Sequence, residues 1–181
     1  MIIRALKPSD LSSMLDWYNH YIGTTTVTFA EEPYTLPRFR ALAEEVTRRY
    51  PWIVLETEGR PVGYAYLNEF NSRHAYRFTA DVTIYLDPEE CGKGYGTILL
   101  KALMEEAVRD GYHKLISLIT SDNAASIHLH ERCGFHPTAR IEHTGYKFGR
   151  WISTVWQECD IAPFEHEPKE PQNLPVLERE I

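Results

Sequence analysis

The order of apolar and polar positions along the chain predicts short strands that alternate with amphipathic helices. Apolar residues recur at helical intervals after Pro8-Ser9-Asp10 and again across "LPRFRALAEEVTRRY", which predicts two helices with one buried face each. β-Branched and aromatic residues crowd other short segments, which is typical of strands. The strands predicted in this half of the chain are 2–6, 52–57, 62–70 and 78–86. A turn at residues 58–60 joins two of them into a hairpin.

The second half of the chain predicts a strand, a crossover helix and a further, parallel strand. The helix covers 98–110, keeps its apolar residues on one face and ends at Gly111. The segment "KLISLIT", 114–120, is almost uniformly apolar, which is the mark of a strand buried on both faces and parallel to its neighbour. A helix within 121–134 and two strands within 135–161 complete an α/β fold, in the broad sense that includes α+β.

Length and composition predict one domain, 1–161, followed by a tail, 162–181. The tail holds four prolines and many charges, so we expect it to lie outside the domain, although its "LPVL" could dock on a neighbouring surface. The net charge of -7 argues against a nucleic-acid partner. Three cysteines at unrelated spacings and the start "MIIRALKPSD" predict a reduced, cytoplasmic protein. No apolar run approaches the length of a membrane helix.

The stretch "YLDPEECGKGYGT" carries the first chemical signal. Gly92, Gly94 and Gly96 stand between a predicted strand and a predicted helix. Backbone N–H groups at a helix N-terminus favour an anion, and glycines let a phosphate approach them closely. The alternative is a tight strand-to-helix turn that binds nothing. The spacing is neither that of a nucleotide P-loop nor GxGxxG, so a dinucleotide fold is not supported.

Six motifs in order resemble one family over nearly the whole chain up to Ile161. They are "YNHYI", "TTTVTF", "GYAY", "AYRFTADVTIYL", "NAASIHLHERCGF" and "KFGRW". The chain resembles the GNAT superfamily of acyl-CoA-dependent N-acyltransferases, and within it the phosphinothricin and methionine-sulfoximine acetyltransferase group. That family's pyrophosphate loop reads arginine or glutamine, two free positions, glycine, a free position, then glycine or alanine. Residues 91–96 match it except at Cys91, where the usual long polar side chain is absent.

The resemblance implies a mixed central sheet that splays in the middle, with flanking helices and with the pantetheine of acetyl-CoA in the split. It implies no metal. The backbone of Ile84, Tyr85 and Leu86 would pair with the pantetheine amides, and Asn123 and Ser126 would contact the same arm. The pyrophosphate would lie on Gly92, Lys93, Gly94, Tyr95, Gly96 and Thr97.

Two titratable residues are candidates for the proton transfers that an acetyl transfer requires. Asp81 lies inside an apolar strand just before the implied pantetheine site, where burial would raise its pKa toward that of a base. The alternative is an edge-strand carboxylate in water; the related enzymes carry Glu here, which favours the base. His130 shares a helix face with Asn123 and Ser126 and occupies the family's proton-donor position. Its alternative is an ordinary surface histidine.

The resemblance also implies a small acceptor with a carboxylate, covered by the loop "FNSRHAYR". Arg73 and Arg77 would grip that carboxylate. Asn71 stands where relatives often carry Arg, so the acceptor can differ from theirs. Phe29, Tyr76 and Phe148 would supply apolar walls, or else are ordinary core residues.

The function expected from these residues is acetyl transfer to the amino group of a small amino acid or analogue. The departures at Asp81, Cys91 and Asn71 leave two alternatives open: a GNAT-fold module that senses acyl-CoA without turnover, and a transferase for protein N-termini or polyamines. A homodimer is also expected, because the resembling enzymes are commonly dimers and "GYKFGRWISTVWQECDI" is rich in large aromatics. Trp151 and Trp156 could instead complete the sheet of the monomer.

Overall fold

The computed structural model describes residues 1–164 and 167–181, and its strands form a single mixed sheet. The order across the sheet is β6-β7-β5-β4-β3-β2-β1-β8. Neighbours are antiparallel except β4 and β5, which are parallel. The strands are β1 (Ile2–Ala5), β2 (Trp52–Thr57), β3 (Arg60–Glu69), β4 (Thr79–Leu86), β5 (Lys114–Thr120), β6 (His136–Lys147), β7 (Arg150–Asp160) and β8 (Arg179–Glu180). The fold class and the predicted strand, crossover helix and parallel strand are confirmed.

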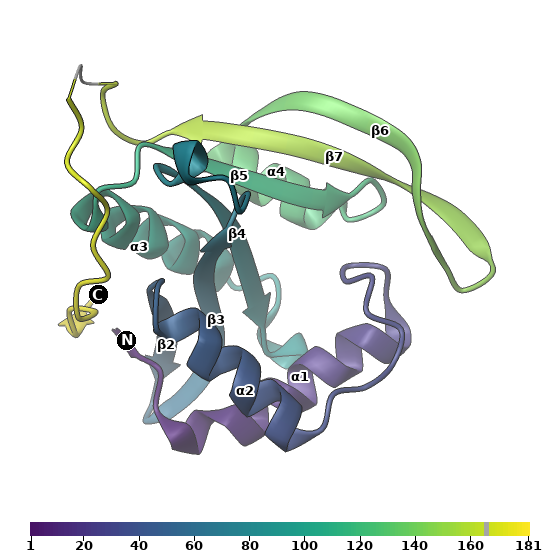
Figure 1. Ribbon diagram of the computed structural model, residues 1–181. Helices are drawn as coiled ribbons and strands as arrows, with labels where there is room; N and C mark the ends of the chain where they lie inside the picture. The colour runs from purple at the N-terminus through teal and green to yellow at the C-terminus, as the bar shows by residue number, and fades with distance from the viewer. Residues whose placement is uncertain (165–166) are drawn as a thin grey trace.

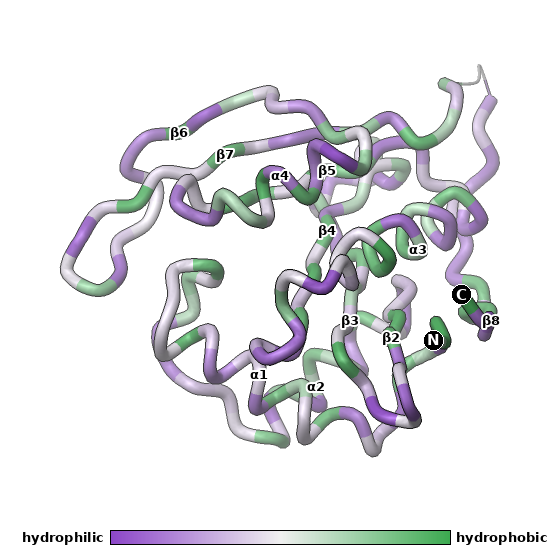
Figure 2. The backbone as a smooth tube through the Cα atoms, turned by 180° about the vertical axis from the view of Figure 1, so that it is seen from behind, coloured by the Kyte–Doolittle hydropathy of each residue, from purple (hydrophilic) through white to green (hydrophobic). Residues whose placement is uncertain are grey.

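Helices cover both faces of the sheet (Figures 1 and 2). They are α1 (Leu11–Thr24), α2 (Leu36–Thr47), α3 (Tyr95–Asp110) and α4 (Ala124–Arg132), with short 3-10 turns at Pro8–Asp10, His74–Tyr76 and Pro88–Glu90. Tyr64 of β3 packs against Trp17 of α1 and Phe39 of α2. Its neighbour Gly63 faces Leu99 of α3. Because successive strand residues point to opposite faces, α1 and α2 cover one face and α3 the other.

The strand "KLISLIT" is less buried than predicted. Leu118, in its middle, is 49% exposed on the face opposite α3 and α4. The prediction of burial on both faces is therefore wrong at this position, where Leu118 borders an open cavity. Among the described helices, none has the length and apolar character needed to cross a membrane.

The C-terminal segment does not stand apart from the domain. It runs along α3 and ends beside the N-terminus, where β8 pairs with β1 (Figure 1). The backbone N–H of Leu174 donates to the Asp110 carboxylate at 3.2 Å, and Arg179 pairs with the buried Glu106 at 2.8 Å. The expectation of a tail outside the domain therefore differs from the structure. Two charged residues of this segment are used in contacts with the domain: Arg179 pairs with Glu105 and Glu106 of α3, and Glu170 pairs with Arg77.

Candidate active site

The parallel strands β4 and β5 separate part-way along their length, and this split forms a cleft. Their register includes the pairs Thr79↔Lys114, Ala80↔Leu115 and Asp81↔Ile116, after which the strands diverge (Figure 1). A cavity of about 570 Å³ fills the split and is lined by Val82–Leu86, 117–119, the glycine loop and α4. On its other side β4 stays paired with β3 as far as Leu86. The split thus exposes one edge of β4, with which an extended ligand can hydrogen-bond.

The glycine loop closes one end of the cleft. Gly94 precedes α3 with φ +86, a left-handed conformation that glycine adopts without strain, and an added Cβ there would meet no atom within 4 Å. Open space therefore lies in front of the N-terminal amides of α3, where the helix dipole favours an anion. Gly96 differs, because its Cβ would lie 3.1 Å from Leu129, so its small size lets α3 pack against α4.

The side chains of this loop stabilise it internally. Lys93 pairs with the buried Glu90 at 2.6 Å, and Arg60 pairs with the same carboxylate. Lys93 is therefore engaged by Glu90, and neither Lys93 nor Tyr95 lines the cleft. Cys91 does line it, and its Sγ lies 3.5 Å from the hydroxyl of Tyr21, which donates to the carbonyl of Leu86 at 3.0 Å. Tyr21 was not predicted as a site residue; within "YNHYI" it has no feature that separates it from its neighbours.

Asp81 lies at the apex of the split, immediately before the first cleft residue, Val82. Burial raises the pKa of its carboxyl to about 7, although a hydrogen bond from the backbone of Val82 opposes this shift. The side chain shares a face of β4 with Thr83 and Tyr85. A carboxyl group with this pKa is half ionised near neutral pH, which suits a general base. Asp81 is half-buried, so its carboxyl is more shielded from water than the alternative of an exposed edge carboxylate requires.

His130 is buried in α4, with 2% of its surface exposed, and borders the cleft. Its Nδ1 lies 2.8 Å from the carbonyl oxygen of Ser126. A carbonyl oxygen can only accept, so Nδ1 carries the proton in the neutral ring and Nε2 presents a lone pair. Nε2 has no partner among the described residues, and burial lowers the pKa of the ring. His130 can therefore accept a hydrogen bond in the cleft, whereas donation from Nε2 requires a second proton.

Two further polar residues line the cleft: Asn123, which was predicted from the sequence, and Ser117, which was not. Asn123 caps α4 by accepting from the backbone of Ser126 at 3.2 Å, which leaves its amide N–H₂ for a ligand. Ser117 of β5 lines the cleft, is buried, and has no hydrogen-bond partner for its hydroxyl among the described residues. Ser117 was not predicted, although a serine inside the apolar run "KLISLIT" is a signal that could have identified it.

The predicted acceptor residues lie elsewhere. Asn71, Arg73, Tyr76 and Arg77 line a second pocket, of about 420 Å³, which shares no lining residue with the cleft. This loop precedes β4, whereas the cleft begins after Asp81, so the first half of the strand separates them. Arg77 pairs with Glu170 at 2.7 Å and is not free for a ligand. The structure thus does not bring these four residues to the cleft.

The loop after α1 closes the opposite side of the cleft and contains Val27, which lines it. The ring of Phe29 packs against Gly145 of β6, while Phe148, in the β6–β7 turn, is 56% exposed. Neither phenylalanine lines the cleft. The buried Lys147 donates to the carbonyl of Thr28 at 2.8 Å and so fastens this loop to the hairpin. Lys147 was not predicted, since a lysine at a strand end usually faces water.

Comparison with known proteins agrees with this geometry. Residues 14–135 match the Acetyltransferase (GNAT) family, and the chain belongs to that family. It is 36% identical to the phosphinothricin N-acetyltransferase of Alcaligenes faecalis, over 84% of this chain and 79% of that protein. It is 34% identical to the L-methionine sulfoximine/L-methionine sulfone acetyltransferase of Pseudomonas aeruginosa, over 92% of this chain and 98% of that protein.

A solved structure shows the same fold with the acetyl donor bound. The phosphinothricin acetyltransferase of Sinorhizobium meliloti, in complex with acetyl-CoA, superposes with a TM-score of 0.84 at 32% identity, covering 87% of this chain and 86% of that one. The chain is therefore an acetyl-CoA-dependent N-acetyltransferase. Its own cleft fits that donor: the free edge of β4 suits an extended amide chain, and the open N-terminus of α3 suits a diphosphate.

Proposed function

We propose that this enzyme acetylates the amino group of a small amino acid or a close analogue, of the phosphinothricin or methionine sulfoximine type. The observation that carries the proposal is the half-buried Asp81 carboxyl, with a pKa of about 7, at the point where β4 and β5 part. The names of the relatives support the acceptor class. Each of the three proteins compared above is described as an acetyltransferase, so an acyl-CoA-sensing module has no support among them.

Acetyl-CoA, when bound, supplies the acetyl group as a thioester. The backbone of Ile84–Leu86, the amides of 92–97 and the N–H₂ of Asn123 would hold it. Asp81 would take a proton from the acceptor's ammonium group, directly or through one water, and so leave a neutral amine. The amine nitrogen would then form the amide bond as the thioester C–S bond breaks, and the second proton that the nitrogen loses would go to the departing thiolate, which leaves as a thiol. Nε2 of His130 would accept a hydrogen bond from a donor in the cleft, because the neutral ring keeps its proton on Nδ1. The role expected for His130, that of an acid, would require the ring to be protonated first.

The acceptor would reach Asp81 from the second pocket. Thr79 lines that pocket and lies two residues before Asp81 on the same face of β4. Arg73 also lines it and makes no ion pair with the described residues, so it is the cation that we assign to the acceptor's carboxylate. In this arrangement the acetyl donor and the acceptor approach the apex of the split from opposite ends of β4.

The acceptor class is tested by a panel assayed for thiol release from acetyl-CoA. Methionine sulfone, methionine sulfoximine, phosphinothricin and the common amino acids are compared with spermidine and with a peptide that has a free N-terminal alanine. We expect at least one amino acid or analogue to exceed both controls in kcat/KM by roughly tenfold or more. A preference for spermidine or for the peptide would establish the corresponding alternative. Tight CoA binding without thiol release from any acceptor would indicate a sensing module.

We also propose that the enzyme is a homodimer formed through the β6–β7 hairpin. Trp151 is 61% exposed, and its ring lies 5.3 Å from that of Tyr146, which is also exposed. Trp151 therefore does not complete the core of the monomer, whereas Trp156 is half-buried and packs near Phe70. Large exposed aromatics on neighbouring strands are typical of an interface.

Sedimentation at micromolar concentration is expected to show a species of twice the 21.0 kDa chain mass. Trp151→Ala should weaken this association, because it removes a large exposed aromatic side chain from the proposed interface. Val108→Ala, at an exposed position on α3, is the matched control and should leave association unchanged. A monomer in the unsubstituted protein at this concentration would contradict the dimer.

A further inference from the structure

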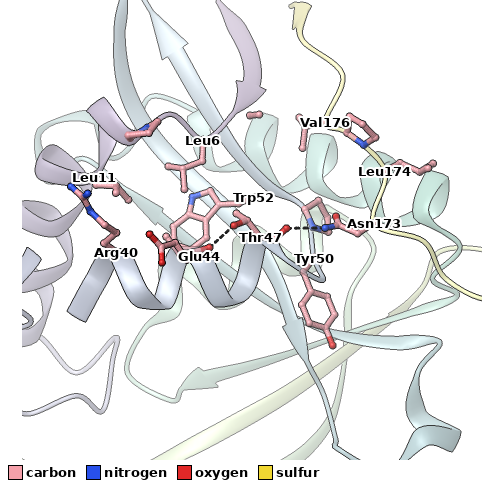
Figure 3. A pocket seen from close by; sticks show the side chains of 15 residues that line it. Leu6, Leu11, Arg40, Glu44, Thr47, Tyr50, Trp52, Asn173, Leu174 and Val176 are labelled. Atoms are coloured by element: carbon pink, nitrogen blue, oxygen red, sulfur yellow. Dashed lines mark hydrogen bonds between the residues drawn. The ribbon is translucent and has the colours of Figure 1, made fainter. Parts of the chain in front are cut away.

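A third cavity, of about 460 Å³, lies away from the cleft between α2, the start of β2 and the C-terminal segment (Figure 3). Its size is within the usual range of small-molecule sites. It shares no lining residue with the cleft between β4 and β5. Most of its wall is apolar, and the C-terminal segment is fastened over it by the Asn173 amide, which donates to the carbonyl of Thr47 at 2.8 Å. The apolar wall comprises Ala5, Leu6, Pro8, Leu11, Ala43, Pro51, Leu174, Pro175 and Val176.

The wall contains one buried donor without an acceptor. Trp52 is 2% exposed, and its indole N–H has no hydrogen-bond partner among the described residues. Figure 3 shows the nitrogen on the edge of the ring that faces Leu6. A buried donor left unpaired is unfavourable, so an acceptor that reached this atom would gain a hydrogen bond.

Two opposite charges stand at the mouth of the cavity. Arg40 and Glu44 are one helical turn apart on α2, and both line the cavity. Residues at this spacing commonly pair with each other, yet neither makes an ion pair within residues 1–164 and 167–181. Arg40, Glu44 and Trp52 all line the same cavity and are labelled around it in Figure 3.

We propose that this cavity is a second ligand site, which binds a small zwitterion with an apolar body, namely an α-amino acid with an aliphatic or aromatic side chain. The ligand's carboxylate accepts from Arg40 and from the Trp52 N–H, and its ammonium donates to Glu44. Its side chain lies against Leu174 and Val176. The four features of the cavity, which are a cation, an anion, a buried donor and an apolar chamber, correspond to the four parts of such a molecule.

The site is tested without acetyl-CoA by following the indole N–H resonances of ¹⁵N-labelled protein during titration with L-leucine and with L-phenylalanine. The chain has four tryptophans, and Trp52→Phe identifies the resonance of Trp52. We expect that resonance to shift saturably with at least one of the two amino acids. Leucinamide, which lacks the carboxylate, and 4-methylpentanoate, which lacks the ammonium, should each bind at least roughly tenfold more weakly. No shift of the Trp52 resonance up to the solubility limit of both amino acids would overturn the proposal.

Matched variants locate the binding. Arg40→Gln and Glu44→Gln should each weaken it by roughly tenfold or more, whereas Arg38→Gln and Glu45→Gln, exposed neighbours on α2 that line neither this cavity nor the second pocket, should leave it unchanged. Asp81→Asn should also keep full affinity, because Asp81 belongs to the other site. Loss of the shift in Asp81→Asn would assign the ligand to the active site and reject the second site. Equal affinities in Arg40→Gln and Arg38→Gln would reject it as well.

Discussion

Asp81→Asn is expected to lower kcat about a hundredfold or more while the affinity for CoA stays nearly unchanged. The amide has the size of the carboxyl group but cannot take a proton from the acceptor's ammonium. CoA affinity should persist because Asp81 does not line the cleft. Steady-state rates of thiol release, together with calorimetric titration of CoA, measure the two quantities. A variant that keeps near-normal turnover would place the base elsewhere.

The pH dependence of kcat/KM is a second test of Asp81 as the general base. Burial raises the pKa of Asp81 to about 7, so the carboxylate that acts as base accumulates as the pH rises through that value. We expect kcat/KM to increase by up to tenfold per pH unit below about pH 7 and to level off above it. If His130 had to act as an acid at the same time, its lowered pKa would leave little enzyme with both groups in the required state.

The thermal stability of Asp81→Asn is the control that separates loss of the base from damage to the fold. A carboxyl group whose pKa is higher in the folded than in the unfolded protein is stabilising at low pH, and its ionisation costs stability as the pH rises toward the folded pKa. Asparagine does not ionise, so the variant should unfold at the same temperature as the parent or at a higher one above pH 7. A lower unfolding temperature would mean that lost activity reflects damage to the fold. Asp81→Glu should remain active, because a carboxyl group is retained.

The glycine loop and the parallel strands could be predicted because their signals are local. Positive φ at Gly94 and the left-handed end of α3 at Gly111 each require a residue type that the sequence displays. The recurrence of apolar residues every three to four positions then sets which faces of the helices are buried. The split between β4 and β5 is not local, and it was expected only because the motifs resemble a family.

Three features could not be predicted from the sequence, and two of them depend on contacts between residues that are distant in it. Arg77 was assigned to a ligand, but Glu170 lies 93 positions away in the sequence and occupies it. The same long-range pairing fastens the C-terminal segment, whose composition predicted exposure. The tautomer of His130 follows from a hydrogen bond one turn back in α4, which residue type and spacing do not reveal.

Gly94→Asp is expected to weaken CoA binding by roughly tenfold or more relative to Gly94→Asn. Asparagine and aspartate tolerate a left-handed backbone better than other residues, and neither would meet an atom within 4 Å of its Cβ. They have nearly the same size and differ by one negative charge, which would stand in the open space before the amides of α3. A like charge a few ångströms from a phosphate costs about 1–4 kcal/mol, depending on exposure to water.

The two variants separate the electrostatic effect from the steric one. The asparagine side chain fills part of the open space at the loop, so Gly94→Asn measures the loss of CoA affinity that has a steric cause. The difference in CoA affinity between the two variants then measures the repulsion between the aspartate and the anion. Added salt should narrow that difference, because exposed charges are screened. The aspartate variant should unfold at the same temperature as the asparagine variant or at a higher one, since a carboxylate at a helix N-terminus is stabilising. Equal CoA affinities for the two variants at low salt would mean that the pyrophosphate does not lie on the amides that follow Gly94.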